Sequence, residues 1–210
     1  MRLLILGASG RVGRHVVDEA LRRGHTVTAL VRTPAKLGDV AGRITIIRGD
    51  ALDRGNVNAA VHGQDAIIYA LGAGNVRHTT LFSASTRILL EAMKLARVRR
   101  LLCVTGVGAG DSKGHGGFFY DRILFPLFTK GIYADKDRQE ALIRDSGTDW
   151  TIVRPASFRA GDQADHLVMV TAIEPSTVLR RISIGEVADF VLDELERHRF
   201  VHQSVFIGHP

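Results

Sequence analysis

The sequence predicts an α/β protein with a doubly wound parallel sheet, in which helices cover both faces. Short apolar runs of strand length alternate with segments of helical spacing along the chain, which predicts βαβ crossovers. The runs are apolar throughout, as expected for strands buried on both faces. A length of 210 residues with 45% hydrophobic residues fits one globular domain with one core.

The elements are expected in alternating order. Residues 2–6 form the first strand and residues 12–21 the first helix, which stops at Gly24. The further expected strands cover residues 26–31, 44–48, 66–71, 100–105 and 150–154. The further expected helices cover residues 53–61, 80–97 and 135–145. Because the first apolar run breaks at Gly7 without a clean cleavage site, it is interpreted as a strand and not as a secretory signal.

Two stretches interrupt this alternation. Residues 106–131 begin with glycines and continue with aromatic and aliphatic residues, directly after a strand whose carboxyl end is expected to face a ligand. Residues 159–181 contain a strand-like run at 167–173, before a helix over 185–197 and a last strand over 204–207. We interpret residues 1–210 as a single domain, in which 159–184 and 198–210 form a small substrate-facing subdomain.

Composition argues against several classes of protein. No apolar run reaches the roughly 18 residues of a membrane span. The net charge is +6, but the arginines occur in scattered pairs, which favours a solvated basic surface over a nucleic-acid site. RNA binding through this basic surface is kept as a minor hypothesis, which predicts an affinity for RNA that falls steeply with salt. The lone Cys103 fits a reducing cytoplasm, and His198 and His202 straddle a predicted helix end, so no metal site is expected.

A glycine-rich turn joins the first strand to the first helix. It reads Gly7-Ala8-Ser9-Gly10-Arg11-Val12-Gly13. Gly7 would permit the tight turn, Gly10 the approach of the backbone to a phosphate, and Gly13 close packing of the helix. The amides and dipole of the helix N-terminus would then face a pyrophosphate. The alternative is a structural turn without a ligand.

The Gly-x-x-Gly-x-x-Gly spacing resembles that of the atypical short-chain dehydrogenases/reductases. The resemblance is to the NmrA-like NAD(P)-binding group, which includes biliverdin reductase B (flavin reductase), and it covers most of the chain. Its further matching pieces are Leu30-Val31-Arg32, Arg48-Gly49-Asp50, Asp135-Lys136 and Trp150-Thr151-Ile152-Val153-Arg154-Pro155. The resemblance implies a Rossmann-type fold and a nicotinamide cofactor, and it says little about the substrate.

The expected cofactor is NADP(H) in preference to NAD(H). The second strand ends in Arg32 without a neighbouring carboxylate, and a guanidinium can bind a 2′-phosphate that a carboxylate would repel. Arg11 is the expected second contact, and a solvent-facing Arg32 is the alternative. Asp50 resembles the family residue near the adenine but is equally typical of a turn. By position, the other cofactor contacts are expected at Ala51, Leu71, Gly72, Thr105, Gly106, Pro155 and Ala156.

Two residues are candidates for the chemistry. Classical members of the superfamily use Tyr-x-x-x-Lys, whereas this chain has Tyr133-Ala134-Asp135-Lys136, one residue short. Residues three apart still share a helix face, so a general acid at Tyr133 beside Lys136 is retained as a hypothesis. Lys136 matches the family position that contacts the nicotinamide ribose, and its alternative is an exposed lysine in a charged run.

The predicted function is NADPH-dependent reduction of a small planar acceptor, flavin- or quinone-like, by a monomer or homodimer. Such an acceptor takes its proton from water, so it needs no dedicated general acid. The expected substrate contacts are Val107, Phe118, Ser157 and Phe158. The Ser and His that lie near the substrate in biliverdin reductase B are absent at the matching positions, so that substrate is not carried over. The alternative function is a non-catalytic NAD(P) sensor.

Overall fold

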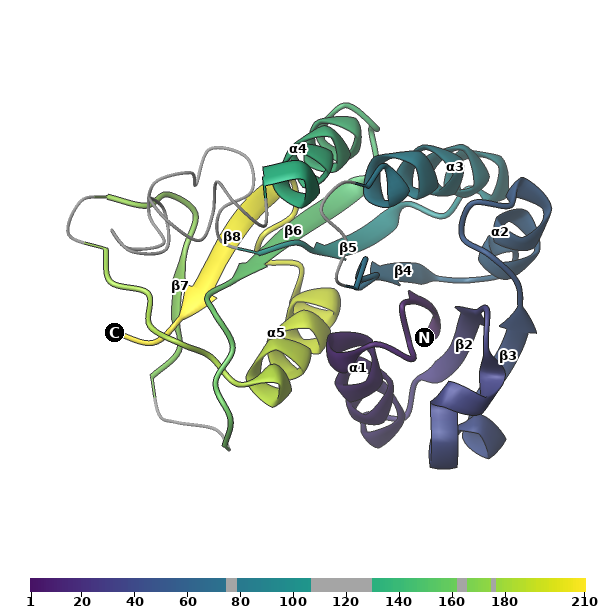
Figure 1. Ribbon diagram of the computed structural model, residues 1–210, viewed down its shortest axis with the longest axis horizontal. Helices are drawn as coiled ribbons and strands as arrows, with labels where there is room; N and C mark the ends of the chain where they lie inside the picture. The colour runs from purple at the N-terminus through teal and green to yellow at the C-terminus, as the bar shows by residue number, and fades with distance from the viewer. Residues whose placement is uncertain (75–78, 107–129, 162–165, 175–176) are drawn as a thin grey trace.

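The computed structural model describes residues 1–74, 79–106, 130–161, 166–174 and 177–210 (Figure 1). The strands are β1 (Arg2–Leu6), β2 (Thr26–Val31), β3 (Thr45–Arg48), β4 (Ala66–Tyr69), β5 (Arg100–Val104), β6 (Asp149–Pro155), β7 (Val168–Val170) and β8 (Gln203–Gly208). The α-helices are α1 (Arg11–Arg22), α2 (Arg54–Val61), α3 (Leu81–Ala96), α4 (Lys130–Arg144) and α5 (Ile184–Arg197). A 3₁₀ segment, η1, covers Pro34–Arg43.

These strands form one sheet in the order β3-β2-β1-β4-β5-β6-β8-β7. The chain runs outward from β1 to β3 on one side and from β4 to the far edge on the other, so the topology switches between β1 and β4. All pairs are parallel except β7 with β8. The predicted doubly wound parallel sheet is therefore confirmed, with one antiparallel strand at its edge.

Helices cover both faces of the sheet, α1 and α5 on one and α2, α3 and α4 on the other (Figure 1). Successive side chains of a strand point to opposite faces. In β1, Leu3 and Ile5 therefore pack in the core under α1 and α5, whereas Leu4 and Leu6 pack under α2 and α3. Burial on both faces explains why the central strands β1, β4 and β5 are mainly apolar.

Three elements differ most from the sequence prediction. Helix α4 begins at Lys130, earlier than the expected residue 135, and the expected strand over 167–173 is only β7. The 3₁₀ segment η1 was not predicted. Its residues lack one continuous helical period because the backbone kinks at Gly38, which has a φ of 61°. No helix in the described residues is long and apolar enough to cross a membrane.

The C-terminal segments share the main sheet, because β8 pairs with β6 and β7 pairs with β8. Two residues before α5 also contact segments next to this edge, since Ile182 bridges to Phe158 after β6 and Arg180 bridges to His209 after β8. That 159–184 and 198–210 form a substrate-facing subdomain stays a prediction.

Candidate functional site

A cleft of about 500 Å³ lies where the topology switches, at the carboxyl ends of the parallel strands. Ligands bind at this place in open α/β sheets because the diverging loops leave a crevice. The cleft receives residues from the ends of five strands and from α4. Its lining includes twelve of the predicted cofactor residues: Gly7, Ser9, Gly10, Arg11, Val12, Arg32, Asp50, Ala51, Leu71, Gly72, Thr105 and Lys136.

The glycine-rich turn forms one wall of this cleft. Gly7 has a φ of 90°, and a Cβ there would collide with the backbone carbonyl of Ala70 at the end of β4. A Cβ at Gly13 would collide with the carbonyl of Gly7, so α1 packs directly on the turn. The amide of Gly10 donates to the Gly7 carbonyl at 2.8 Å and closes the turn. The positions of Gly7 and Gly13 thus require glycine for steric reasons.

Helix α1 presents an uncapped N-terminus at the cleft. Its N-cap is Gly10, which has no side chain to accept from the first amides, and its first turn holds no acidic residue. Such amides, together with the helix dipole, favour an anion. The turn therefore fits a pyrophosphate both in shape and in charge.

Two exposed cations line the cleft at the carboxyl end of β2. Arg32 follows β2 directly, and Lys36 comes from η1. Within the described ranges neither side chain has an acidic partner, so both are available to a ligand. Sequence reasoning missed Lys36, because only the unpredicted 3₁₀ segment brings it to this place.

Asp50 closes a turn and also lines the cleft. Its Oδ1 accepts from the amide of Leu52 at 2.9 Å, which is the hydrogen bond of an Asx turn. The residue also lines the cleft after β3. Asn56 accepts from the Asp50 amide at 2.9 Å and fixes this loop.

Lys136 and Arg32 line opposite ends of the cleft. Arg32 follows β2, whereas Lys136 contacts Thr105 after β5, and β1 and β4 lie between these two strands. Its Nζ donates to the backbone carbonyl of Thr105 and lies 5.4 Å from the ring centre of Phe82. The side chain is half-buried and is not the exposed lysine of the alternative hypothesis. Burial lowers its pKa, whereas Cys103 and Glu140 act in the opposite direction.

The neighbouring Asp135 explains how α4 is held in place. It is fully buried, and its carboxylate accepts from the Phe82 amide at 2.8 Å and from the Ser83 hydroxyl at 2.5 Å. These groups belong to the first turn of α3, so Asp135 caps that helix from outside. The Asp135-Lys136 pair therefore joins a structural residue to a cleft residue.

Other predicted residues lie beside the cleft without lining it. Tyr133 is half-buried, with its ring centre 6.0 Å from Lys136 Nζ. Gly106 follows Thr105 directly, and Ala156 donates its amide to Ile207 at 2.9 Å. The predicted site residues that do not line the cleft are Gly13, Gly106, Tyr133, Pro155, Ala156 and Ser157. Val107 and Phe118 lie outside the described residues.

The cleft lining also includes residues that were not predicted as site residues, although Leu30, Val31 and Gly49 lie in the matching pieces of the resemblance. They sit on the same strand ends and loops as the predicted ones, which is the positional signal that could have found most of them. They are Leu30, Val31, Lys36, Gly49, Ala70, Gly74, Leu81 and Val104.

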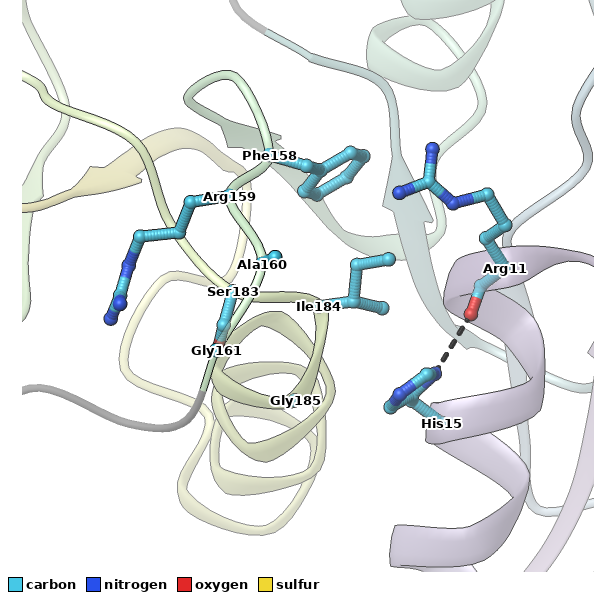
Figure 2. Close-up of a pocket in the computed structure, with 9 residues that line it drawn as sticks. All are labelled: Arg11, His15, Phe158, Arg159, Ala160, Gly161, Ser183, Ile184 and Gly185. Atoms are coloured by element: carbon cyan, nitrogen blue, oxygen red, sulfur yellow. Dashed lines mark hydrogen bonds between the residues drawn. The ribbon is translucent and has the colours of Figure 1, made fainter.

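A second cavity of about 660 Å³ adjoins the cleft, because Arg11 and Phe158 line both. Figure 2 shows the start of α1 on one side and the loop after β6 with the start of α5 on the other. The Arg11 guanidinium lies 5.8 Å from the Phe158 ring centre, and Ile184 points into the space between them. Arg159 points away from Arg11 and contacts Glu186 at 3.4 Å. The cavity therefore has an aromatic and aliphatic wall and two arginines, of which Arg11 lies beside Phe158.

Comparison with known proteins identifies the family. A family described as NAD(P)H-binding matches residues 7–198, nearly the whole chain and all of the cleft. The chain belongs to this NAD(P)H-binding family. Its fold is accordingly the NAD(P)-binding Rossmann fold of oxidoreductases, as the resemblance implied. Among the described residues, no cluster of three or more His, Cys, Asp or Glu side chains could hold a metal ion.

Members and structural neighbours of the NAD(P)H-binding family align over most of the chain. An uncharacterized protein of Bacillus subtilis, YwnB, is 30% identical over 93% of this chain and 92% of its own. A probable pinoresinol-lariciresinol reductase 3 of Arabidopsis thaliana is 29% identical over 100% of this chain and 68% of its own. ChuY, an anaerobilin reductase of Escherichia coli, superposes with a TM-score of 0.84 at 21% identity, over 100% of this chain and 98% of its own.

Proposed function

We propose that this chain is an NADPH-dependent reductase that transfers hydride to a small planar acceptor of the flavin or quinone class. The observation that carries the proposal is the cleft at the topological switch. It has an anion-binding helix N-terminus at its centre, two cations at one end and Lys136 at the other. The reductase names of two of the similar proteins support the reaction class.

The preference for NADPH over NADH rests on Arg32. Its guanidinium can donate two hydrogen bonds to a 2′-phosphate, and β2 ends without a carboxylate that would bind the ribose of NADH. Lys36 adds a second positive charge at the same end of the cleft. Arg11 lies further along the cleft, where it borders both cavities.

Lys136 binds and orients the nicotinamide ribose in this proposal. The cofactor supplies the hydride, so the protein has to bind, orient and exclude water. Tyr133 does not line the cleft, which favours an acceptor that takes its proton from water. The same observation supports the second candidate function, an NAD(P) sensor without catalysis.

The second cavity is the proposed acceptor site. Phe158 borders both cavities, so its ring can stack on a planar acceptor while that acceptor reaches the cofactor. Ser157 remains a candidate polar contact, although it lines a different surface hollow near Arg180. We place the protein in the cytoplasm, because its lone Cys103 can form no internal disulfide. We further propose that it acts as a monomer or homodimer without a nucleic-acid or membrane partner.

Parallel titrations test the proposal. The cofactor-free protein is titrated with NADPH and NADH at one salt concentration, followed by nicotinamide fluorescence, and then assayed with flavins and quinones. We expect tighter binding of NADPH and acceptor-dependent oxidation. Binding without turnover of any acceptor would favour the sensor, and binding of neither nucleotide would contradict both functions.

A further inference from the structure

A fully buried ion pair lies directly behind the cleft. Arg154 of β6 and Glu140 of α4 are both inaccessible to solvent. The guanidinium donates to Glu140 through Nη2 at 2.5 Å and through Nε at 3.2 Å, and it stacks over Phe206 at 4.9 Å. Arg144 also contacts the Glu140 carboxylate at 3.1 Å. Two buried charges in such tight contact hold α4 and β6 in one relative position.

This ion pair is connected to Lys136 through one residue. The Thr105 hydroxyl donates to Glu140 Oε1 at 2.8 Å, and the Thr105 carbonyl accepts from Lys136 Nζ. Lys136 and Glu140 are one helical turn apart, so α4 presents both side chains on one face. Thr105 follows β5, and its amide donates to the Val153 carbonyl at 2.9 Å, which ties the residue to β6. Lys136 is thus tethered by a carbonyl whose residue is itself held by Glu140.

The charges around Lys136 oppose one another. Burial lowers its pKa, and Cys103 and Glu140 counteract this effect. The Cys103 thiol of β5 is itself kept neutral, because burial raises its pKa. From α4 the group is faced by Glu140 and Tyr133, and from β6 Arg154 lies behind Glu140. Among the described neighbours, Glu140 is therefore the carboxylate that opposes the effect of burial on the Lys136 pKa.

We infer that Glu140, held by Arg154, is a positioning residue for Lys136, which it serves through Thr105. It keeps the ammonium group charged and aimed at the ribose end of the cleft. This role rests on the proposed function, since the ribose is what Lys136 would bind. It extends the site to two residues that do not touch the cleft.

The chain contains a matched control. Arg100 of β5 and Glu194 of α5 form a second buried ion pair at 2.8 Å, and the Thr151 hydroxyl donates to Glu194 Oε1 at 3.0 Å. This group has the same three residue types, and in addition the Thr151 hydroxyl accepts from Arg100 and donates to the Phe200 carbonyl, each at 2.9 Å. It lies at the amino ends of β5 and β6 and lines neither the cleft nor the adjoining cavity. Matched variants therefore remove the same side-chain group at the two ends of these strands.

The experiment compares Glu140→Gln and Thr105→Val with Glu194→Gln and Thr151→Val in the full chain. The first readout is the pKa of Lys136, measured by NMR of ¹³Cε-lysine and assigned with Lys136→Arg. The second is the dissociation constant of NADPH. We expect Glu140→Gln to lower the Lys136 pKa by about one unit and to weaken NADPH binding about tenfold. Thr105→Val should weaken binding about threefold, and the two control variants should change neither readout.

Equal behaviour of the two sets would overturn the inference, because loss of stability alone would then explain every change. If Glu140→Gln does not fold, the comparison of Thr105→Val with Thr151→Val in the same two readouts tests the inference. Each of these variants removes one hydroxyl at nearly constant volume. The NMR titration needs no nucleotide, so it separates this inference from the proposed function. If the wild-type chain binds NADPH but Glu140→Gln leaves the Lys136 pKa unchanged, the inference is contradicted and the proposed function is not.

Discussion

Two buried ion pairs of the same composition lie at opposite ends of β5 and β6. Arg154–Glu140 lies at the carboxyl ends, behind the cleft, and Arg100–Glu194 lies at the amino ends. Glu194 accepts from the amides of Arg199 and Phe200, each at 3.0 Å, so it also fixes the turn after α5. Glu140 accepts instead from Thr105, which holds Lys136. The same chemistry thus stabilises a turn at one end and a candidate site at the other.

The largest expected effect is on stability. Arg100→Met and Arg154→Met each leave a buried carboxylate without its main partner, which costs about 3–5 kcal/mol of unfolding free energy. We expect the larger loss for Arg100→Met, because Glu140 retains Arg144 at 3.1 Å. Urea unfolding measures both. Only Arg154→Met should also weaken NADPH binding, and a similar weakening by Arg100→Met would break the distinction between the two ends.

The next effect concerns the glycine turn at the functional end. Gly13→Ala places a Cβ against the backbone carbonyl of Gly7, so the turn or α1 must shift. We expect a loss of roughly 1–3 kcal/mol in unfolding free energy, together with weaker NADPH binding. Gly42→Ala is the control, since a Cβ there meets no atom within 4 Å. Equal thermal melting and NADPH titration curves for the two variants would contradict the steric role of Gly13.

A smaller effect is expected at the exposed end of the cleft. Arg32→Ala should reduce the preference for NADPH over NADH about tenfold, or roughly 1.4 kcal/mol, because it removes a charge-assisted contact to the 2′-phosphate. Arg48→Ala, at the end of the neighbouring β3, is the matched control because Arg48 is exposed and does not line the cleft. An unchanged ratio of the two dissociation constants in Arg32→Ala would sink the assignment.

The smallest effect concerns a partly exposed ion cluster. Arg22 and Arg23 lower the pKa of Glu19 to about 2, and Arg23 also contacts Asp193 of α5 at 2.7 Å. The folded pKa lies below the unfolded one, so this stabilisation is present above about pH 4.5 and is lost as the pH falls toward 2. The raised pKa of Asp189 offsets part of it.

Between pH 5 and pH 2.5, wild type should therefore lose about 1 kcal/mol more unfolding free energy than Glu19→Gln. Urea unfolding at the two pH values measures the difference. An equal loss of unfolding free energy in both proteins would show that this cluster contributes no pH dependence to stability.

The sequence predicted the residues of the cleft better than the buried ion pair of Arg154 and Glu140 behind it. Gly7, Gly13 and Arg32 are found because a turn between a strand and a helix is a local pattern, and parallel strands end at a shared edge. Asp135 and Glu140 lie in a run of charged residues that reads as a solvated helix face, but both are fully buried. A charged side chain is buried only when a partner meets it, and Arg154 comes from another element. Local periodicity contains no sign of such a partner.

The last strand of the chain is not the last strand of the sheet. β8 lies between β6 and β7, and β7 pairs with β8 alone. During synthesis, residues 168–170 consequently have no strand to join until residues 203–208 have left the ribosome. Pairing of this edge therefore has to wait for β8, and deletion of residues 203–210 would leave β6 as an open edge for pairing with other chains.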